Sequence, residues 1–218
     1  MNMDFQMMLT KVAAFFPIFL FSICFHEFAH GLVAKWKGDR TAELAGRLTL
    51  NPFAHADLFG TVIFPIIGVI TGFFFGWAKP VPINERNLKN PKKDLFWIAL
   101  AGPLSNIFLA FVMTILIGLT AKFFGTIKLM KTINDLGGKF IITNLALAVF
   151  NTLPLHPLDG GKIIARFIPD AADRWLEENQ SMLFIILMFM LLVTPLSIVL
   201  MIPIKILYGL LMSLLDVI

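Results

Sequence analysis

The residues His26-Glu27-Phe28-Ala29-His30 form an HExxH sequence at the end of an apolar run. In a helix, positions i and i+4 lie on one face, so both imidazoles can bind the same metal ion. Glu27 is turned about 100° from His26, which places its carboxylate beside the ion, where a base can take a proton from metal-bound water. With 4 His and 5 Glu in 218 residues, chance gives about one HExxH in 600 shuffled sequences. The motif therefore predicts a zinc site with His26 and His30 as ligands and Glu27 as the general base.

A catalytic zinc ion usually takes three protein ligands and keeps one position open for water. Asp159 is the preferred third ligand, because it ends an apolar run where Pro154 and Pro157 interrupt the helix. A carboxylate at the end of a broken membrane helix suits a metal ion that faces a water-filled cavity. The competing candidates are His156 and, more weakly, His55 and Asp57.

The composition indicates a membrane protein. Hydrophobic residues make up 58% of the chain and charged residues 15%, against roughly 45–50% and 25% in soluble domains. This balance excludes a soluble fold and a disordered chain. The net charge of +4 is spread over several loops, which favours contact with a lipid bilayer and argues against a nucleic-acid partner. The single cysteine, Cys24, excludes an internal disulfide and a cysteine-based metal cluster.

Long uncharged apolar runs predict an all-α polytopic membrane protein with four to six membrane elements. We expect one membrane-embedded domain over 1–218, with a catalytic core at about 12–166 and C-terminal membrane segments at about 179–218. The runs are Val12–Phe25, Leu58–Ala78, Leu95–Ala121, Phe140–Leu158 and Asn179–Ile204, followed by a short apolar tail at Ile206–Leu215.

The second run, Leu58–Ala78, is expected to be a re-entrant hairpin. If it crossed the bilayer fully, the basic loops before and after it would lie on opposite faces and the charge bias would vanish. Non-helical backbone at membrane depth is tolerated where protein covers it or a wet cavity adjoins it. A full crossing is the less favoured alternative. The run contains four residues that break or bend helices: Pro65, Gly68, Gly72 and Gly76.

The hairpin model also places the predicted zinc ligands on one side of the membrane. With a hairpin, the third run leaves and the fourth returns, so Asp159 emerges on the side where His26 and His30 lie. We therefore expect a multi-pass protein of the cell membrane with its active site toward the cytoplasmic side.

Two stretches outside these runs also give predictions. Apolar residues alternate with polar ones over Thr41–Leu50, which predicts a short β element near the cytoplasmic face, with an interfacial loop as the alternative. The mixed, glycine-containing stretch Lys122–Lys139 is predicted to be a loop.

Taken together, the motifs resemble those of the site-2 proteases, the intramembrane zinc metalloproteases, in particular their short prokaryotic branch. The resemblance covers about Phe16 to Arg166. Besides HExxH, it rests on Asn151-x-x-Pro154, Leu158-Asp159-Gly160, the segment Gly76–Pro82, and Gly102-Pro103-x-x-Asn106.

The resemblance implies hydrolysis of a peptide bond in or next to a transmembrane helix of a membrane protein substrate. It implies that Zn²⁺ is the cofactor, with His26, His30 and Asp159 as its ligands and Glu27 as general base and proton shuttle. Asn151 would steady the substrate carbonyl or the oxyanion. Asn106 and the stretch Thr41–Leu50 would help to seat an unwound substrate.

Two other classes of function stay open. A membrane zinc transporter also carries His and carboxylate residues within the membrane, but this chain has 4 His and no His-rich loop. A catalytically inactive protease relative that acts as a binding partner would keep the same fold. The complete HExxH and Asp159 argue against that reading.

Overall fold

The computed structural model describes residues 3–71, 76–124, 128–194 and 196–215. These residues form helices joined by turns and loops, and no strand occurs among them. Three helical segments are long and apolar enough to cross a membrane, namely Thr10–Trp36, Pro91–Phe123 and Lys131–Asn151. The helical architecture expected for a membrane protein is therefore confirmed.

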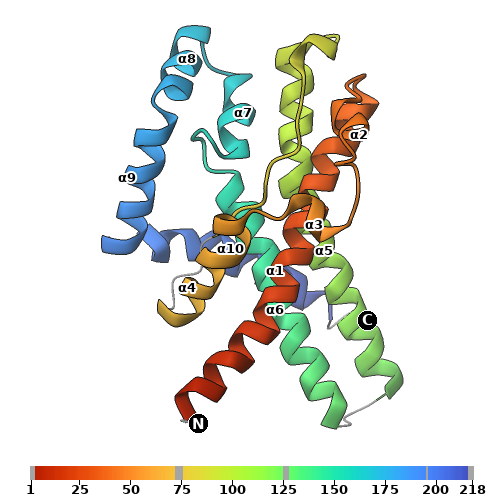
Figure 1. Ribbon diagram of the computed structural model, residues 1–218. Coiled ribbons are helices and arrows are strands. Elements are labelled where there is room, and N and C mark those ends of the chain that lie inside the picture. The colour runs from red at the N-terminus through yellow and green to blue at the C-terminus, as the bar shows by residue number, and fades with distance from the viewer. Residues whose placement is uncertain (1–2, 72–75, 125–127, 195, 216–218) are drawn as a thin grey trace.

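The centre of the molecule is built from α1 (Met3–Trp36), α5 (Pro91–Phe124) and α6 (Lys128–Asn151). Each of these helices packs against the other two. In Figure 1 they meet in the middle, and α1 then runs away from the neighbouring α5 and α6 toward the end at which the chain begins. Apolar side chains of α5 and α6 pack with α10 (Leu196–Ser213) in a core of Ala110, Ile117, Ile141, Leu145 and Ile204.

The run Leu58–Ala78, of which residues 72–75 are not described, begins and ends at neighbouring positions, and its helical part packs against α1. It begins as a π-helical segment, η1 (Leu58–Ile63), and continues as α4 (Phe64–Thr71). On the return, the N–H of Trp77 donates to the carbonyl of Gly60 at 3.0 Å and the N–H of Lys79 donates to that of His55 at 2.9 Å. The two ends are thus joined, as the hairpin model requires, while Gly72 lies outside the described residues.

The β element predicted at Thr41–Leu50 is a helical turn instead. Helix α2 (Thr41–Leu44) is followed by turns and bends as far as Leu50. Its backbone bonds are local, with Leu44 N–H donating to Arg40 O at 2.9 Å and Ala45 N–H to Thr41 O at 3.0 Å. These bonds outweigh an alternation that extends over too few residues to recruit a partner strand. Two further short helices are α3 (Pro52–His55) and η2 (Glu85–Asn87).

The loop predicted at Lys122–Lys139 is also mostly helical, because α5 ends at Phe124 and α6 begins at Lys128. Gly137 lies within α6 and faces α5, where an added Cβ would come within 2.7 Å of Ile117 Cδ1. The close approach of the two helices at this glycine stabilises a helix that glycine on its own disfavours.

After α6 the chain forms four shorter helices: α7 (Asp159–Ala165), α8 (Asp170–Glu178), α9 (Gln180–Val193) and α10. The fifth apolar run is therefore divided between α9, of 14 residues, and α10, of 18 residues. Both are shorter than the roughly 20 residues that an upright crossing needs. Pro195, the residue expected to bend this run, lies outside the described residues.

Candidate metal centre

Three of the predicted zinc ligands meet at one point between α1 and α7. The Nε2 atoms of His26 and His30 are 3.0 Å apart, one helical turn from each other on α1. The Asp159 carboxylate contacts both rings, with Oδ2 at 3.0 Å from His26 Nε2 and Oδ1 at 3.3 Å from His30 Nε2. The fold thus brings together side chains that are 133 positions apart in the chain.

The outer nitrogens of both rings are bonded to oxygen acceptors. His26 Nδ1 lies 2.6 Å from Asn106 Oδ1, and His30 Nδ1 lies 2.6 Å from the backbone carbonyl of Ile98. A carbonyl oxygen only accepts, so each Nδ1 must carry the proton, and a neutral ring then directs the Nε2 lone pair inward. Two lone pairs and a carboxylate converge here and would repel one another without a cation between them. Two imidazoles and one carboxylate form the donor set of many catalytic zinc sites, so these residues fit the ion.

Asp159 supplies the negative charge of this donor set. Its side chain is 16% exposed. A carboxyl group binds a metal ion in its ionised form, and a cation beside it favours that form.

A glycine on α5 leaves room for the inner faces of the two rings. An added Cβ at Gly102 would overlap with Nε2 of both His26 and His30. The backbone of α5 therefore approaches the donor atoms more closely than any side chain would permit. Gly102 belongs to the motif Gly102-Pro103-x-x-Asn106, but its position in the sequence does not indicate this contact with the two rings.

Glu27 lies at the same site, where a backbone N–H of the segment after the hairpin holds its carboxylate. One carboxylate oxygen of Glu27 and one ring nitrogen each of His26 and His30 lie within 4.8 Å of one another. Glu27 Oε2 accepts a hydrogen bond of 2.8 Å from the N–H of Val81, in the extended segment after the hairpin. The carboxylate thus stands next to the three-ligand cluster, in reach of a water molecule bound there.

The cluster opens into a cavity of about 410 Å³. Its wall includes Asn151, the last residue of α6, whose Nδ2 donates to the Leu147 carbonyl at 2.9 Å. Counting from Trp36 at the end of α1, His30 is six residues and His26 ten residues into the helix, which is about 9 and 15 Å. The two histidines therefore lie well inside an apolar helix and not at the helix end. The cavity is lined by residues from α1, α5, α6, α7, α9 and the 76–83 segment, among them Glu27, Trp77, Pro80, Asn151 and Lys162.

The weaker ligand candidates are bound elsewhere. His55 Nε2 pairs with the carbonyl of Thr49 at 2.8 Å, and the Asp57 carboxylate accepts from the N–H of Gly60 at 2.7 Å. His156 Nε2 lies 3.1 Å from Asp173 Oδ1. The structure does not bring any of these three to the paired imidazoles.

Asn106 does not lie where a substrate-seating role requires. Its side chain is fully buried on α5, behind His26, and it is absent from the lining of the cavity. Its contacts are with the ring of His26 and with Asn144 and Ser22. Ser22 lies one helical turn before His26, on the same face of α1, but nothing in the spacing of Asn106 or Asn144 links these two residues to the HExxH motif.

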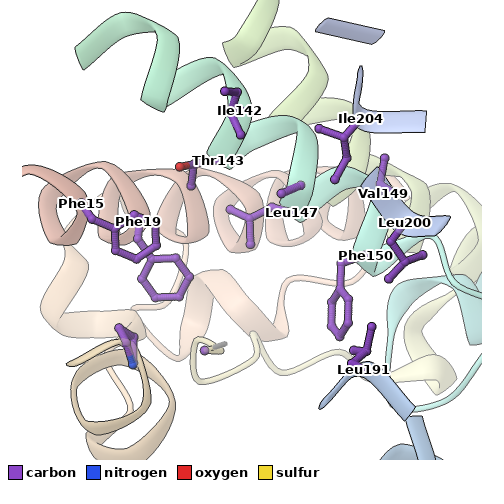
Figure 2. Close-up of a pocket in the computed structure, with 13 residues that line it drawn as sticks. Phe15, Phe19, Ile142, Thr143, Leu147, Val149, Phe150, Leu191, Leu200 and Ile204 are labelled. Atoms are coloured by element: carbon purple, nitrogen blue, oxygen red, sulfur yellow. The ribbon is translucent and has the colours of Figure 1, made fainter. Parts of the chain in front are cut away.

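A second cavity, of about 310 Å³, adjoins the first and is almost entirely apolar. Figure 2 shows Phe15 and Phe19 of α1 on one side, Leu147 and Phe150 of α6 between, and Leu191 of α9 on the other side. Leu147, Phe150 and Gly76 line both cavities. An apolar chamber and the metal centre thus share a wall.

Comparison with known proteins agrees with the site. The model of peptidase family M50 matches residues 14–137 and 128–195. A protein of Bacillus subtilis (strain 168) named "Putative zinc metalloprotease YwhC" is 40% identical over 179 residues, which cover 81% of this chain and 78% of that protein.

Two mycobacterial proteins named "Putative zinc metalloprotease Rip2" are more distant. The protein from Mycolicibacterium smegmatis is 29% identical over 81% of this chain and 65% of its own length. The one from Mycobacterium tuberculosis (strain H37Rv) is 25% identical over 78% of this chain and 64% of its own length. No solved structure matches the chain. With one family model spanning most of its length and a relative at 40% identity, the chain belongs to peptidase family M50, the site-2 protease family.

Proposed function

We propose that this protein is an intramembrane zinc metalloprotease that hydrolyses a peptide bond in or next to a transmembrane segment of a membrane protein substrate. The observation that carries the proposal is the convergence of His26 Nε2, His30 Nε2 and the Asp159 carboxylate beside Glu27, below the end of an apolar helix. Zinc bound by these three residues would supply Lewis acidity and lower the pKa of water to near 7.

Two side chains of the cavity are proposed to carry out the proton transfer and to stabilise the negative charge on the substrate oxygen. Glu27 accepts a proton from the attacking water as the new C–O bond forms, and it gives that proton to the amine nitrogen as the C–N bond breaks. Asn151 has two N–H donors on its amide, of which one is committed to the Leu147 carbonyl. The other is proposed to donate to the substrate oxygen as negative charge develops on it.

The apolar cavity supports a substrate that comes from within the bilayer. A transmembrane segment seated against Phe19 and Phe150 would keep its side chains in an apolar environment while its backbone reaches the adjoining metal centre. The basic loops and the joined ends of the hairpin support an active site on the cytoplasmic side.

The test is to purify the protein in detergent, measure zinc, and incubate it with a panel of single-span substrates. Wild type and Glu27→Gln should both hold one zinc ion per chain, and only wild type should cleave, with the cut mapped by mass spectrometry to the apolar segment or its border. Full cleavage by Glu27→Gln would remove that residue from the mechanism. Zinc uptake into proteoliposomes without cleavage would favour a transporter instead.

A further inference from the structure

Three buried polar side chains behind the metal centre form a continuous chain of hydrogen bonds. Asn106 on α5, Asn144 on α6 and Ser22 on α1 are each fully buried. Asn106 Oδ1 lies 2.6 Å from His26 Nδ1, Asn106 Nδ2 lies 2.9 Å from Asn144 Oδ1, and Asn144 Nδ2 lies 2.9 Å from Ser22 Oγ. This series of hydrogen bonds therefore links a predicted metal ligand to all three central helices.

The direction of every bond in this chain is fixed by backbone carbonyls at its far end. Asn144 Nδ2 donates to the carbonyl of Phe140 at 2.9 Å, and Ser22 Oγ donates to that of Ile18 at 2.8 Å. Because a carbonyl only accepts, the amide of Asn144 has one possible orientation, and its Oδ1 must face Asn106. The nitrogen of Asn106 must then point toward Asn144, which leaves its oxygen for His26.

We propose that Asn106, Asn144 and Ser22 act as a positioning relay that keeps the proton of His26 on Nδ1 and its Nε2 lone pair directed at the metal. The inference rests on the proposed zinc-dependent function. His30 needs no such relay, because its Nδ1 donates directly to the backbone carbonyl of Ile98. Hydrogen bonds to the outer nitrogen of a ligand histidine fix its orientation, and their loss typically weakens metal binding about 10- to 100-fold.

The relay also explains why two asparagines and a serine are buried, although burying polar side chains without partners lowers the stability of the fold. An asparagine side chain buried without partners destabilises a protein, so such residues occur in pairs or networks that satisfy one another. Here the network extends across α1, α5 and α6, so that the packing of these helices and the orientation of one ligand are linked. A purely apolar contact would hold the helices together but would leave His26 free to turn.

The test compares zinc affinity in Asn106→Leu, Asn144→Leu and their double variant, using chelator competition on protein in detergent. Each single change should raise the zinc Kd about 10- to 100-fold, and the double variant should bind about as weakly as Asn106→Leu alone, because the relay passes through Asn106. The matched control is Thr114→Val, which removes another fully buried polar group of α5 that bonds only to the carbonyl of Ala110. It should leave the Kd unchanged.

A second readout separates positioning from general loosening of the fold. In zinc-loaded protein labelled at histidine nitrogen, the hydrogen-bonded Nδ1–H signals of His26 and His30 are both expected. Asn106→Leu should lose the His26 signal and keep that of His30, whereas the control Thr114→Val should keep both signals.

Wild-type zinc affinity in Asn144→Leu, or a His26 signal that persists in Asn106→Leu, would overturn the relay. These outcomes do not depend on cleavage. A wild type that binds zinc but cuts no substrate would refute the proposed function and leave the relay standing, and a wild type that binds no zinc would refute both.

Discussion

The backbone N–H of Val81 donates a hydrogen bond of 2.8 Å to Glu27 Oε2, although the two residues are 54 positions apart. Val81 is buried and stands between Pro80 and Pro82, whose rings restrict the backbone on both sides. The extended segment after the hairpin thus fixes one oxygen of the carboxylate that we propose as general base. A backbone donor cannot rotate away as a side chain can, so the position of Glu27 depends on the position of this segment.

The change Val81→Pro removes that donor and should lower the cleavage rate about 10- to 100-fold, because a misplaced base loses the alignment on which proton transfer depends. Zinc content should match wild type, since the three ligands are untouched. Val81→Ala, which keeps the N–H, is the control and should cleave at close to the wild-type rate. Equal rates for the proline and alanine variants would show that the bond has no part in catalysis.

The ligand assignment is tested by comparing two buried histidines. His26→Ala should abolish stoichiometric zinc binding, because it removes one of three ligands. His55→Ala removes a fully buried ring that pairs with the carbonyl of Thr49 and lies away from the cavity. It should retain one zinc ion per chain by elemental analysis, even if its unfolding temperature falls. Zinc retained in His26→Ala would contradict the assignment.

Gly102 provides a test by addition of a single methyl group. Gly102→Ala would place a Cβ against Nε2 of both His26 and His30, so we expect at least a tenfold loss of zinc affinity. Gly209→Ala on α10 is the matched control, because an added Cβ there meets nothing within 4 Å. It should keep wild-type affinity and gain up to about 1 kcal/mol of stability from helix propensity. An unchanged zinc Kd in Gly102→Ala would show that α5 can move away from the rings.

Asp39 joins the end of α1 to the segment before α5. Its carboxylate is fully buried and accepts from the N–H of Thr41 at 3.0 Å, the N–H of Asn84 at 2.7 Å and Asn87 Nδ2 at 2.8 Å. Asp39→Asn replaces one acceptor oxygen with a donor and should lower the free energy of unfolding by about 1–3 kcal/mol. Thermal unfolding in detergent measures the change.

The same residue predicts a dependence on pH. Burial would raise the pKa of Asp39, but the hydrogen bonds from Thr41, Asn87 and Asn84 outweigh it and hold the pKa below its ordinary value. A lowered pKa in the folded state means that the stabilisation is complete above the unfolded value of about 3.9 and is lost as the pH falls through the folded value. The difference in unfolding temperature between wild type and Asp39→Asn should therefore narrow as the pH falls below about 4. A constant difference from about pH 7 to about pH 3 would exclude this origin.

The cluster of His26, His30 and Asp159 was predictable from the sequence because its parts are local signals. HExxH specifies one face of a helix, and Asp159 is a carboxylate at a helix break near the end of an apolar run. The structure brings these residues together, and it joins the ends of the predicted hairpin. Helical periodicity was enough to pair His26 with His30, and the charge bias of loops favoured the hairpin, whereas the choice of Asp159 over His156 was also supported by the family resemblance.

The errors arose where packing between helices decides the outcome. Gly137 on its own favours a loop over a helix, yet in the structure it allows α5 and α6 to approach closely at Ile117. The alternation at Thr41–Leu50 resembles a strand, yet the carboxylate of Asp39 and local backbone bonds form a helical turn there. Asn106 was expected to face a substrate and instead bonds to His26, because the register between α1 and α5 cannot be read from either helix alone.

The bonds that join Trp77 to Gly60 and Lys79 to His55 have a consequence for how this region tolerates changes in length. Since the chain exits where it entered, residues gained or lost between these anchor points alter how far the excursion reaches and leave the polarity of α5 and α6 as it was. A change in the length of a helix that crosses the membrane fully would instead displace every element that follows it in the chain. A change in the length of this segment would thus act first on the chain around Val81, whose N–H bonds to Glu27, and would leave the direction of the later helices unchanged.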